Sequence, residues 1–466
     1  AGAAGASGMA AGPVLVIDNG GGFIRAGLSS GRGPTVNEPN CVAAARGGAG
    51  QRLAIGSQAL DIPACVLRRP TRRGLVLDLA QQVRIWDYVL RKRLGVSPRE
   101  LGSVLVTDTP FSPREIRSEV QDVFLNTFGF QEVGVVPAPP LALLSPGIRK
   151  QLDAKNPCCT LLSLGFSGCI AMPCVDSQPI KKAVRRLNVG GRVLTNLLLE
   201  RLRLQHFDLS RSWLVAEDIL AKAGEVSSDF DRDLRSDFAL VEPRSYVLPD
   251  FHDIRRGFLE QASGTAPPAA SVTPAASSRH AASAAAAAPP VKRRRLGGAT
   301  PRAAATAARD ALAPSLVTDA TAASATAPAG AQRVVLRAER VAVPEALFSP
   351  GDHGMSHVAG LPELVHRAIL AVGEQEAWRM SFGQVVLCGA LARLPGLSER
   401  LESELRQFLP EHWPLRIVVE EEPELSVWRG AAQFACDPEH RKRHFVSPQQ
   451  AALDRASPGA GAASAP

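Results

Sequence analysis

Short apolar runs alternate with stretches of helical periodicity in two regions of the chain, from about residue 13 to 259 and from about 333 to 446. In the first region the pattern predicts strands at 14–18, 23–28, 104–106, 133–136, 160–164 and 169–174, and helices at 80–94, 112–128 and 190–204. A Ser-Pro-Arg-Glu capping box at Ser112 predicts where the second helix begins. Strands that alternate with helices indicate an α/β fold.

One unit, a strand, a glycine-rich turn and a second strand, occurs twice about 145 residues apart, which indicates an internal duplication. The second copy lies within 156–175, an uncharged stretch about long enough to span a bilayer. Prolines and glycines interrupt it, so two buried strands joined by a turn are the better interpretation, and no membrane partner is expected.

The composition changes sharply at 261–330, which contains no Phe, Trp or Tyr and is dominated by Ala, Ser, Thr and Pro. We therefore expect a disordered insertion at 261–332, and disordered ends at 1–12 and 451–466. The net charge is +8, of which the seven basic and two acidic residues of 261–330 supply +5 and the remainder +3. One basic cluster there is a candidate nuclear-import signal, with a solvated charge run or a flexible DNA contact as alternatives: Lys292, Arg293, Arg294 and Arg295.

The first turn carries candidate chemistry, because Asp18 and Asn19 precede three glycines and Arg25 follows them. Glycines let backbone N–H groups approach a phosphate, an acid beside them can hold a metal ion through water, and an arginine adds positive charge. A glycine-rich hairpin turn without a ligand is the commoner case. The second turn, 165–168, strengthens the phosphate hypothesis, since two facing hairpins can hold one phosphate chain. The eight cysteines include no C-x-x-C, so no protein metal site is predicted.

The segment 16–27, Val-Ile-Asp-Asn-Gly-Gly-Gly-Phe-Ile-Arg-Ala-Gly, resembles the first phosphate loop of the actin family. Further segments that resemble the family follow in its order: 187–195, 339–348, 385–396 and 426–430. The resemblance covers about 13–260 and 333–450. Within the family, the segments 188–192 and 245–251 and the insertion after Phe258 are most similar to one class of nuclear actin-related proteins.

This resemblance implies an actin-like, two-lobed α/β fold with duplicated ribonuclease-H-like cores and a central nucleotide cleft. The first lobe would comprise 13–150, with 430–450 returning to it, and the second 151–260 and 333–429. The implied phosphate contacts are Asp18, Asn19, Gly20, Gly21, Gly22, Arg25, Gly165, Phe166 and Ser167. Those implied on the base and ribose side are Gly191, Gly389 and Ala390.

The sequence departs from the family at positions that matter for hydrolysis. Ser163 stands where the family has an acid that orders the metal and the attacking water, and Pro137 where it has the glutamine that positions that water. Phosphoryl transfer depends on positioning and charge stabilisation, so losing both groups costs several orders of magnitude in rate. The family's polar base contacts fall on Leu220, Ala221 and Glu424. We therefore expect no catalytic residues and negligible ATPase activity, with ATP bound without hydrolysis or the cleft empty, and magnesium left open.

The resemblance further implies a non-catalytic scaffold subunit of a Swr-type chromatin-remodelling complex, which exchanges a variant histone into nucleosomes. Its partners would be the other subunits, including the motor ATPase, and indirectly the histones or the nucleosome. The implied location is the nucleus, with the cytoplasm left open. Two alternatives remain from the sequence: a weak ATPase of the actin superfamily, and a cytoskeletal actin-like protein that forms filaments.

Overall fold

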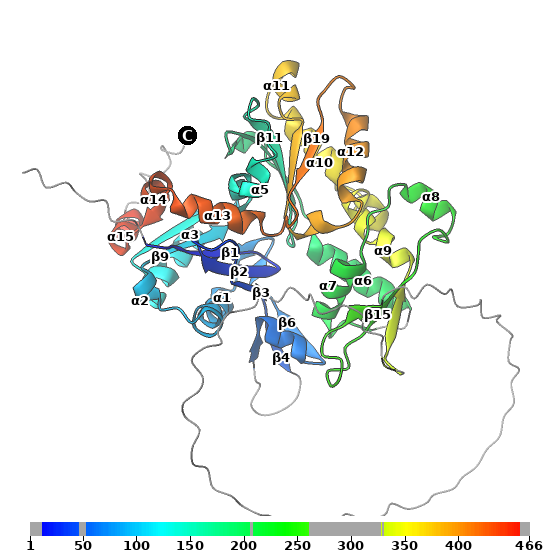
Figure 1. Cartoon of the computed structure of the whole chain (residues 1–466), viewed down its shortest axis with the longest axis horizontal. Helices are drawn as coiled ribbons and strands as arrows, with labels where there is room; N and C mark the ends of the chain where they lie inside the picture. The colour runs from blue at the N-terminus through cyan, green and yellow to red at the C-terminus, as the bar shows by residue number, and fades with distance from the viewer. Residues whose placement is uncertain (1–11, 46–52, 206–207, 261–327, 329, 457–466) are drawn as a thin grey trace, which may run out of the picture. The chain divides into compact units, whose positions relative to one another are not determined.

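The computed structural model describes residues 12–45, 53–205, 208–260, 328 and 330–456. Its first core is built on a six-stranded sheet with the order β20-β10-β9-β1-β2-β3 (Figure 1). The strands are β1 (Leu15–Asn19), β2 (Phe23–Leu28), β3 (Val36–Pro39), β9 (Ser103–Asp108), β10 (Glu132–Pro137) and β20 (Phe445–Val446). β1 runs antiparallel to β2, whereas β1, β9 and β10 are parallel. The carboxyl ends of these three parallel strands therefore meet at one edge of the sheet.

The helices of this core are α1 (Leu79–Asp87), α2 (Pro98–Leu101), α3 (Arg114–Asp122), α4 (Ala138–Leu141), α13 (Ser426–Cys436), α14 (Pro438–His444) and α15 (Pro448–Ala456), whereas α5 (Pro146–Arg149) packs through Ile148 on the second core. The helices predicted at 80–94 and 112–128 are both confirmed, since α1 continues through η2 (Tyr88–Leu94) and α3 through η3 (Val123–Phe128). Their apolar faces meet on the sheet, where the buried rings of Trp86 and Phe124 lie 4.8 Å apart. The capping box was wrong, because Pro113 takes the N-cap position and no side chain caps the first turn.

The second core repeats the arrangement of the first. Its strands are β11 (Cys158–Leu164), β12 (Cys169–Val175), β13 (Gln178–Pro179), β14 (Arg185–Leu187), β18 (Gln384–Cys388) and β19 (Arg416–Val419). The order β13-β12-β11-β18-β19 matches β3-β2-β1-β9-β10, again with one antiparallel hairpin beside three parallel strands. The predicted α/β class and the duplicated cores are confirmed.

The helices of the second core are α6 (Gly191–Leu204), α7 (Trp213–Ala223), α8 (Phe230–Arg235), α9 (Ala338–Ala342), α10 (Leu361–Leu370), α11 (Glu376–Met380) and α12 (Leu397–Phe408). In α6 the side chains of Leu194, Leu198 and Leu202 recur every fourth residue, so they lie on one face of the helix and are buried together. Among the described helices, none is long and apolar enough to cross a membrane.

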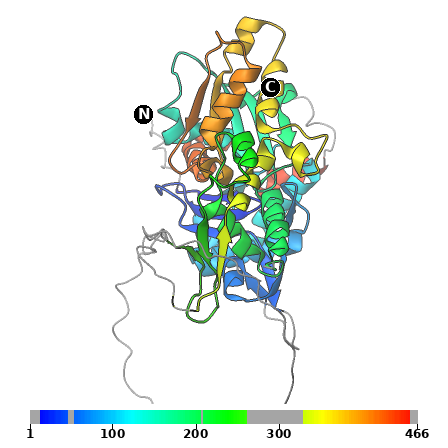
Figure 2. The ribbon, with the colours of Figure 1, turned by 90° about the vertical axis from the view of Figure 1, so that its right-hand side faces the viewer.

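Three smaller sheets complete the structure. β5 (Leu53–Ile55), β4 (Val42–Ala45) and β6 (Cys65–Arg68) pair in the order β5-β4-β6, and β7 (Thr71–Arg72) pairs with β8 (Leu75–Val76). β16 (Phe258–Leu259), β15 (Arg244–Val247) and β17 (Arg333–Leu336) pair in the order β16-β15-β17, and this sheet contacts α7. The yellow-green β17 lies beside green strands in both views (Figures 1 and 2). The chain thus leaves this sheet after β16 and returns to it at β17, and these two strands lie on opposite sides of β15. The insertion predicted between these strands lies at 261–327 outside the described residues, as does 1–11.

The C-terminal part returns to the first core, as β20 pairs with β10 and α13 packs on β1. The indole of Trp428 in α13 is fully buried, and its Nε1 donates a hydrogen bond to the Val16 carbonyl at 3.3 Å. The prediction of a disordered tail from 451 was wrong for 451–456, which belong to α15. This helix starts at a proline, buries Ala451 and joins α3 through the ion pair of Arg455 with Asp122 at 2.5 Å.

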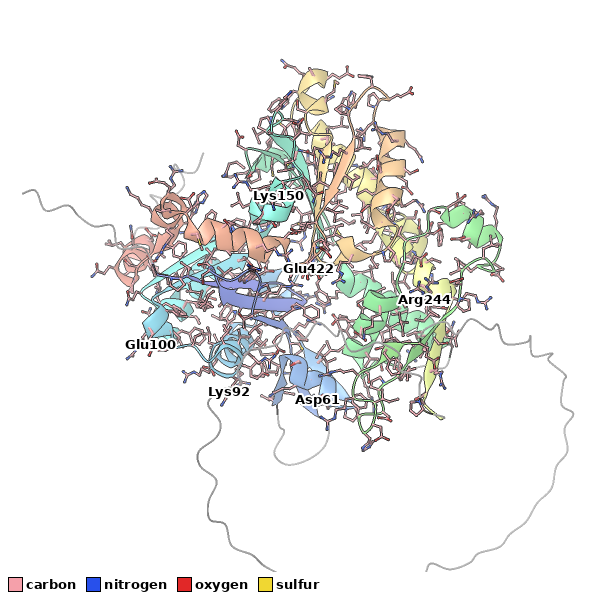
Figure 3. The ribbon with its side chains drawn as sticks, in the orientation of Figure 1. Asp61, Lys92, Glu100, Lys150, Arg244 and Glu422 are labelled. Atoms are coloured by element: carbon pink, nitrogen blue, oxygen red, sulfur yellow. The ribbon has the colours of Figure 1, made fainter. Side chains whose placement is uncertain are left out.

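Charged side chains such as Lys92, Glu100 and Lys150 project from the surface (Figure 3).

Candidate functional site

The two glycine-rich hairpins, β1–β2 and β11–β12, meet around a cavity of about 180 Å³. Most residues proposed from the sequence line it: Asp18, Asn19, Gly20, Gly21, Gly22, Arg25, Ser163, Gly165, Phe166, Ser167, Gly389 and Ala390. The structure therefore brings together positions that are more than 350 residues apart in sequence. Gly191 does not line the cavity but lies against Phe166.

Asp18 is the centre of a buried polar network in the first hairpin. Its carboxylate accepts a hydrogen bond from the hydroxyl of Thr107 at 2.9 Å and pairs with Arg25 at 3.4 Å. Burial raises the pKa of Asp18 above its usual value, while the charge of Arg25 and the Thr107 hydrogen bond act against that rise. Asn19 extends the network, because its side-chain oxygen accepts from Trp86 Nε1 at 3.2 Å. These contacts fix the position of the loop at the end of β1.

The second hairpin is held from behind by the start of α6. The backbone N–H groups of Gly191 and Arg192 donate to the carbonyl oxygens of Gly165 and Phe166 at 3.2 and 3.0 Å. A Cβ on Gly190 would come within 2.6 Å of backbone atoms of Gly165 and Gly168, so a glycine is needed for this close approach. The first turn of α6 therefore uses these N–H groups to order the loop, and they are not directed at a ligand.

The two hairpin turns touch each other directly. A Cβ added to Gly21 would lie 2.3 Å from the hydroxyl oxygen of Ser167, and one added to Gly22 would lie 2.9 Å from the ring of Phe166. The glycines of the first loop thus make room for side chains of the second. Two facing hairpins were predicted, and the structure has them. The side chains of Phe166 and Ser167 occupy the space between the two turns.

Arg69, just after β6, ties the loops to α7. Its guanidinium donates to the Gly22 carbonyl at 2.6 Å and to both oxygens of Glu217 at 2.7 and 2.9 Å. Its charge also lies 4.4 Å from the centre of the Phe166 ring and 5.2 Å from that of Trp213. Burial raises the pKa of Glu217 to about 7, although the charge of Arg69 opposes this. No local pattern in the sequence indicates this cluster, because Arg69 and Glu217 are 148 residues apart.

Two further wall residues, Thr107 and Asp108, were also missed, although the sequence did contain a signal for them. They end strand β9, which is parallel to β1, and polar residues at the carboxyl ends of neighbouring parallel strands converge on one edge. Burial raises the pKa of Asp108, while the hydrogen bond from the backbone N–H of Thr109 at 2.7 Å and the charge of Arg117 act against the rise.

Some of the residues that depart from the family pattern line the cavity, and others do not. Ser163 lines the cavity with a neutral hydroxyl, and Pro137 pairs in register with Asp108 but is absent from the cavity wall. Leu220 is buried in the core of the second lobe and does not line the cavity, and neither does Ala221. Glu424 does line it, and its carboxylate pairs with Arg393 at 2.6 Å.

The fit of a nucleotide can be tested against these walls. Arg25 lines the cavity, and its buried Nε has no hydrogen-bond partner among the described residues, so its guanidinium has spare capacity for an anion. The volume of about 180 Å³ is below the roughly 300–1,000 Å³ of most small-molecule sites. The carboxylates of Asp108 and Glu424 face the same space. The residues therefore fit a phosphate-sized anion, and they do not fit a complete nucleoside triphosphate in this closed arrangement.

Two predictions concern regions beyond the cleft. The basic cluster at 292–295 lies outside the described residues. Within the described ranges, no group of three or more His, Cys, Asp or Glu side chains is arranged to hold a metal ion.

Comparison with known proteins identifies the family. The model of the family described as Actin matches residues 9–449. The chain is 29% identical over 434 residues to "Actin-related protein 6" of Oryza sativa subsp. indica, and 27% identical over 435 residues to that of Arabidopsis thaliana. It is 24% identical over 437 residues to the protein of that name from Drosophila melanogaster, and all three alignments cover 91% of this chain and 93% of the relative. The class that the sequence was found to resemble is that of actin-related protein 6, and this resemblance is confirmed. The chain belongs to the actin family.

Proposed function

We propose that this protein is a non-catalytic scaffold subunit of a Swr-type chromatin-remodelling complex, located in the nucleus, that takes part in exchanging a variant histone into nucleosomes. The observation that carries the non-catalytic part is the state of the cleft. The two hairpin loops are joined to each other through Phe166, Ser167 and Arg69, while Ser163 and Pro137 occupy the positions that would order the attacking water.

A scaffold needs a stable fold and does not need turnover. The Arg69 guanidinium holds the closed loops together without a ligand, through the Gly22 carbonyl and the face of the Phe166 ring. If ATP binds, the loops must first separate, which costs the energy of these contacts and lowers the apparent affinity. Bound nucleotide would then be held without hydrolysis by the first loop and Arg25, with no group at Ser163 or Pro137 to position water.

The partner assignment is tested by purifying the tagged full-length protein from nuclear extract and identifying co-eluting proteins by mass spectrometry. The expected result is a Swi2-type motor ATPase with its partner subunits, absent from a preparation of the untagged extract. Recovery of the protein alone, or with cytoskeletal proteins, would contradict the proposal. In the second case, concentration-dependent sedimentation would support the filament alternative.

The absence of catalysis is tested by phosphate release from magnesium-ATP. Turnover of the wild type should equal that of an Asp18→Asn variant, which removes the charge of the buried acid of the first loop and keeps an acceptor for Thr107. A rate above that of the variant would show an active ATPase and overturn the non-catalytic assignment.

The location is tested with a fluorescent fusion. Changing Lys292, Arg293, Arg294 and Arg295 to alanine should shift the protein from the nucleus toward the cytoplasm. A matched change of Arg302 and Arg309, in the same stretch of the sequence, should leave the distribution unchanged. Equal nuclear signal for both variants would remove the cluster as an import signal.

A further inference from the structure

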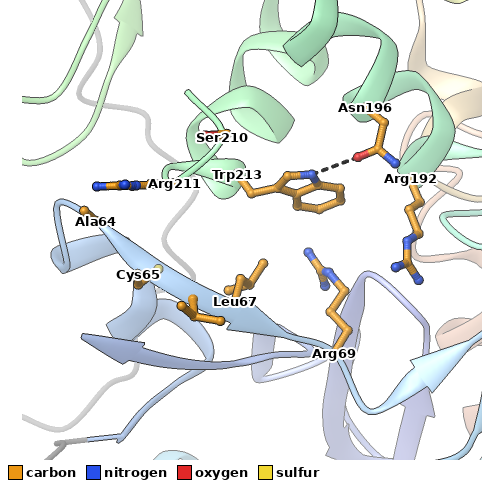
Figure 4. A pocket seen from close by; sticks show the side chains of 10 residues that line it. Ala64, Cys65, Leu67, Arg69, Arg192, Asn196, Ser210, Arg211 and Trp213 are labelled. Atoms are coloured by element: carbon orange, nitrogen blue, oxygen red, sulfur yellow. Dashed lines mark hydrogen bonds between the residues drawn. The ribbon is translucent and has the colours of Figure 1, made fainter. Parts of the chain in front are cut away.

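A second and larger cavity, of about 410 Å³, lies between strand β6 and helices α6 and α7 (Figure 4). Its volume is within the range of ordinary ligand sites. The walls that matter here are Leu67 and Arg69 from β6 and its end, Arg192 and Asn196 from α6, and Arg211 and Trp213 at the start of α7. Arg69 and Phe166 separate it from the cleft between the hairpins, because both contact the first loop. No motif of the sequence had pointed to this cavity.

The cavity is positively charged. Arg192 and Arg211 are exposed, and within the described part of the chain neither guanidinium has an ion pair or side-chain hydrogen bond. The Asp208 carboxylate accepts from the backbone N–H of Ser210 at 3.0 Å and does not pair with Arg211. Arg192 also lies in the first turn of α6, where the helix dipole adds positive potential. Both guanidinium groups are therefore available to carboxylates.

Between the two arginines the wall is apolar and rigid. The indole of Trp213 is fixed by a hydrogen bond from Nε1 to the side-chain oxygen of Asn196 at 3.1 Å and by an edge-on contact with Phe166. Figure 4 shows the indole on the opposite side of the cavity from Leu67 and Arg69. A flat, fixed aromatic wall is suited to an apolar side chain.

Strand β6 supplies a backbone edge. In the sheet β5-β4-β6 it is an outer strand, so one side of its backbone has no strand partner among the described residues. Edge strands of this kind pair with extended peptides, which gain affinity from main-chain hydrogen bonds and specificity from neighbouring pockets. On this side the N–H of Cys65 already donates to the carbonyl of Arg211 at 3.2 Å, so the backbone of Leu67 is the part of the edge that is left for a peptide.

We propose that this cavity binds an extended acidic peptide segment of a partner protein, which pairs with the edge of β6, places carboxylates on Arg192 and Arg211, and lays an apolar side chain on Trp213. Charge complementarity decides the occupant. The chain's own stretch at 261–330 carries seven basic and two acidic residues and is not complementary to the site. The inference uses the pocket alone and stands whether or not the remodelling role is correct.

The test measures fluorescence anisotropy of a fluorescein-labelled peptide of alternating Glu and Val with the full-length protein, against a peptide of alternating Lys and Val. The double variant R192A/R211A should weaken binding of the acidic peptide about 10-fold at low salt, since each exposed arginine–carboxylate pair contributes roughly threefold. The matched control is Arg68→Ala, which removes an exposed arginine of the same strand that does not line the cavity. It should bind like the wild type. Hydrogen exchange at the amide of Leu67 should slow when the peptide is bound.

Three outcomes would overturn the proposal. Equal binding by the wild type and the double variant would exclude the site. An equal loss in Arg68→Ala would show diffuse charge attraction. Binding of inorganic pyrophosphate that depends on Arg192 and Arg211, with no protection of the Leu67 amide by the peptide, would assign the cavity to a small anion.

Discussion

The two glycine-rich hairpins occupy equivalent places in the duplicated cores, yet they carry different chemistry. The β1–β2 hairpin holds a buried acid and arginine, Asp18 and Arg25, whereas the segment 156–175 around the β11–β12 hairpin contains no charged residue. In the second hairpin the polar function is replaced by packing, with Phe166 against Gly22 and the guanidinium of Arg69. The strand order is the same in both cores, so the same sheet accommodates a loop held by a buried ion pair and a loop held by packing. The following predictions separate these two roles.

The largest effect is expected from Asp18→Ala in the first hairpin. The variant leaves the buried Arg25 without its carboxylate and removes the acceptor of the Thr107 hydrogen bond. Breaking a buried pair from one side costs about 3–5 kcal/mol in the free energy of unfolding, which denaturant titration measures. Asp18→Asn keeps an acceptor for Thr107 and should lose less. A loss under about 1 kcal/mol for Asp18→Ala would mean that the charge network is not what fixes this loop.

A smaller loss, about 2 kcal/mol, is expected from Phe166→Ala in the second hairpin. The ring is half-buried and covers Gly22, so truncation removes both its packing and the surface beneath Arg69. Hydrogen exchange at residues 20–22 should become faster, because the first loop loses its cover. The control is Phe166→Tyr, which keeps the ring and should behave like the wild type. Unchanged exchange in Phe166→Ala would show that the two loops are ordered independently.

The sequence predicted the parts of this structure that follow from local pattern. The hairpins and α6 were found because apolar periodicity and glycine turns are visible over a few residues. Helix α15 was not predicted, because the Ala- and Gly-rich composition of the following residues suggested disorder for the whole tail. The helix is buried only through its packing on α3, which the local sequence does not indicate. The Arg69–Glu217 pair was not predictable, since its partners meet only when β6 and α7 are packed together. Asp108 could have been predicted from the parallel order of the strands.

Arg69 contacts both Phe166 of the second hairpin and Glu217 of α7. Glu217 should make the free energy of unfolding depend on pH. Burial raises the pKa of Glu217 to about 7, above its ordinary value of 4.5, so the folded state binds this proton more tightly than the unfolded state. The stability that this tighter proton binding supplies is fully present below about pH 4.5 and is lost as the pH rises through about 7. Between these values the free energy of unfolding of the wild type should fall relative to that of Glu217→Gln, on the order of 1 kcal/mol per pH unit. Parallel pH profiles of the two proteins would contradict this assignment.

The smallest effect is expected from Ser163→Ala, the variant that corresponds in place to Asp18→Ala. Ser163 is half-buried and neutral, and among the described residues no ion pair depends on it, so the change should stay within about 0.5 kcal/mol in denaturant titration. The comparison of the two variants then measures how much of the shared core depends on its loop chemistry. If Ser163→Ala costs as much as Asp18→Ala, the second hairpin has kept a polar role that its packing conceals. If the two differ as expected, the duplicated core tolerates the loss of its acid because Phe166 and Arg69 hold the loop by contact alone.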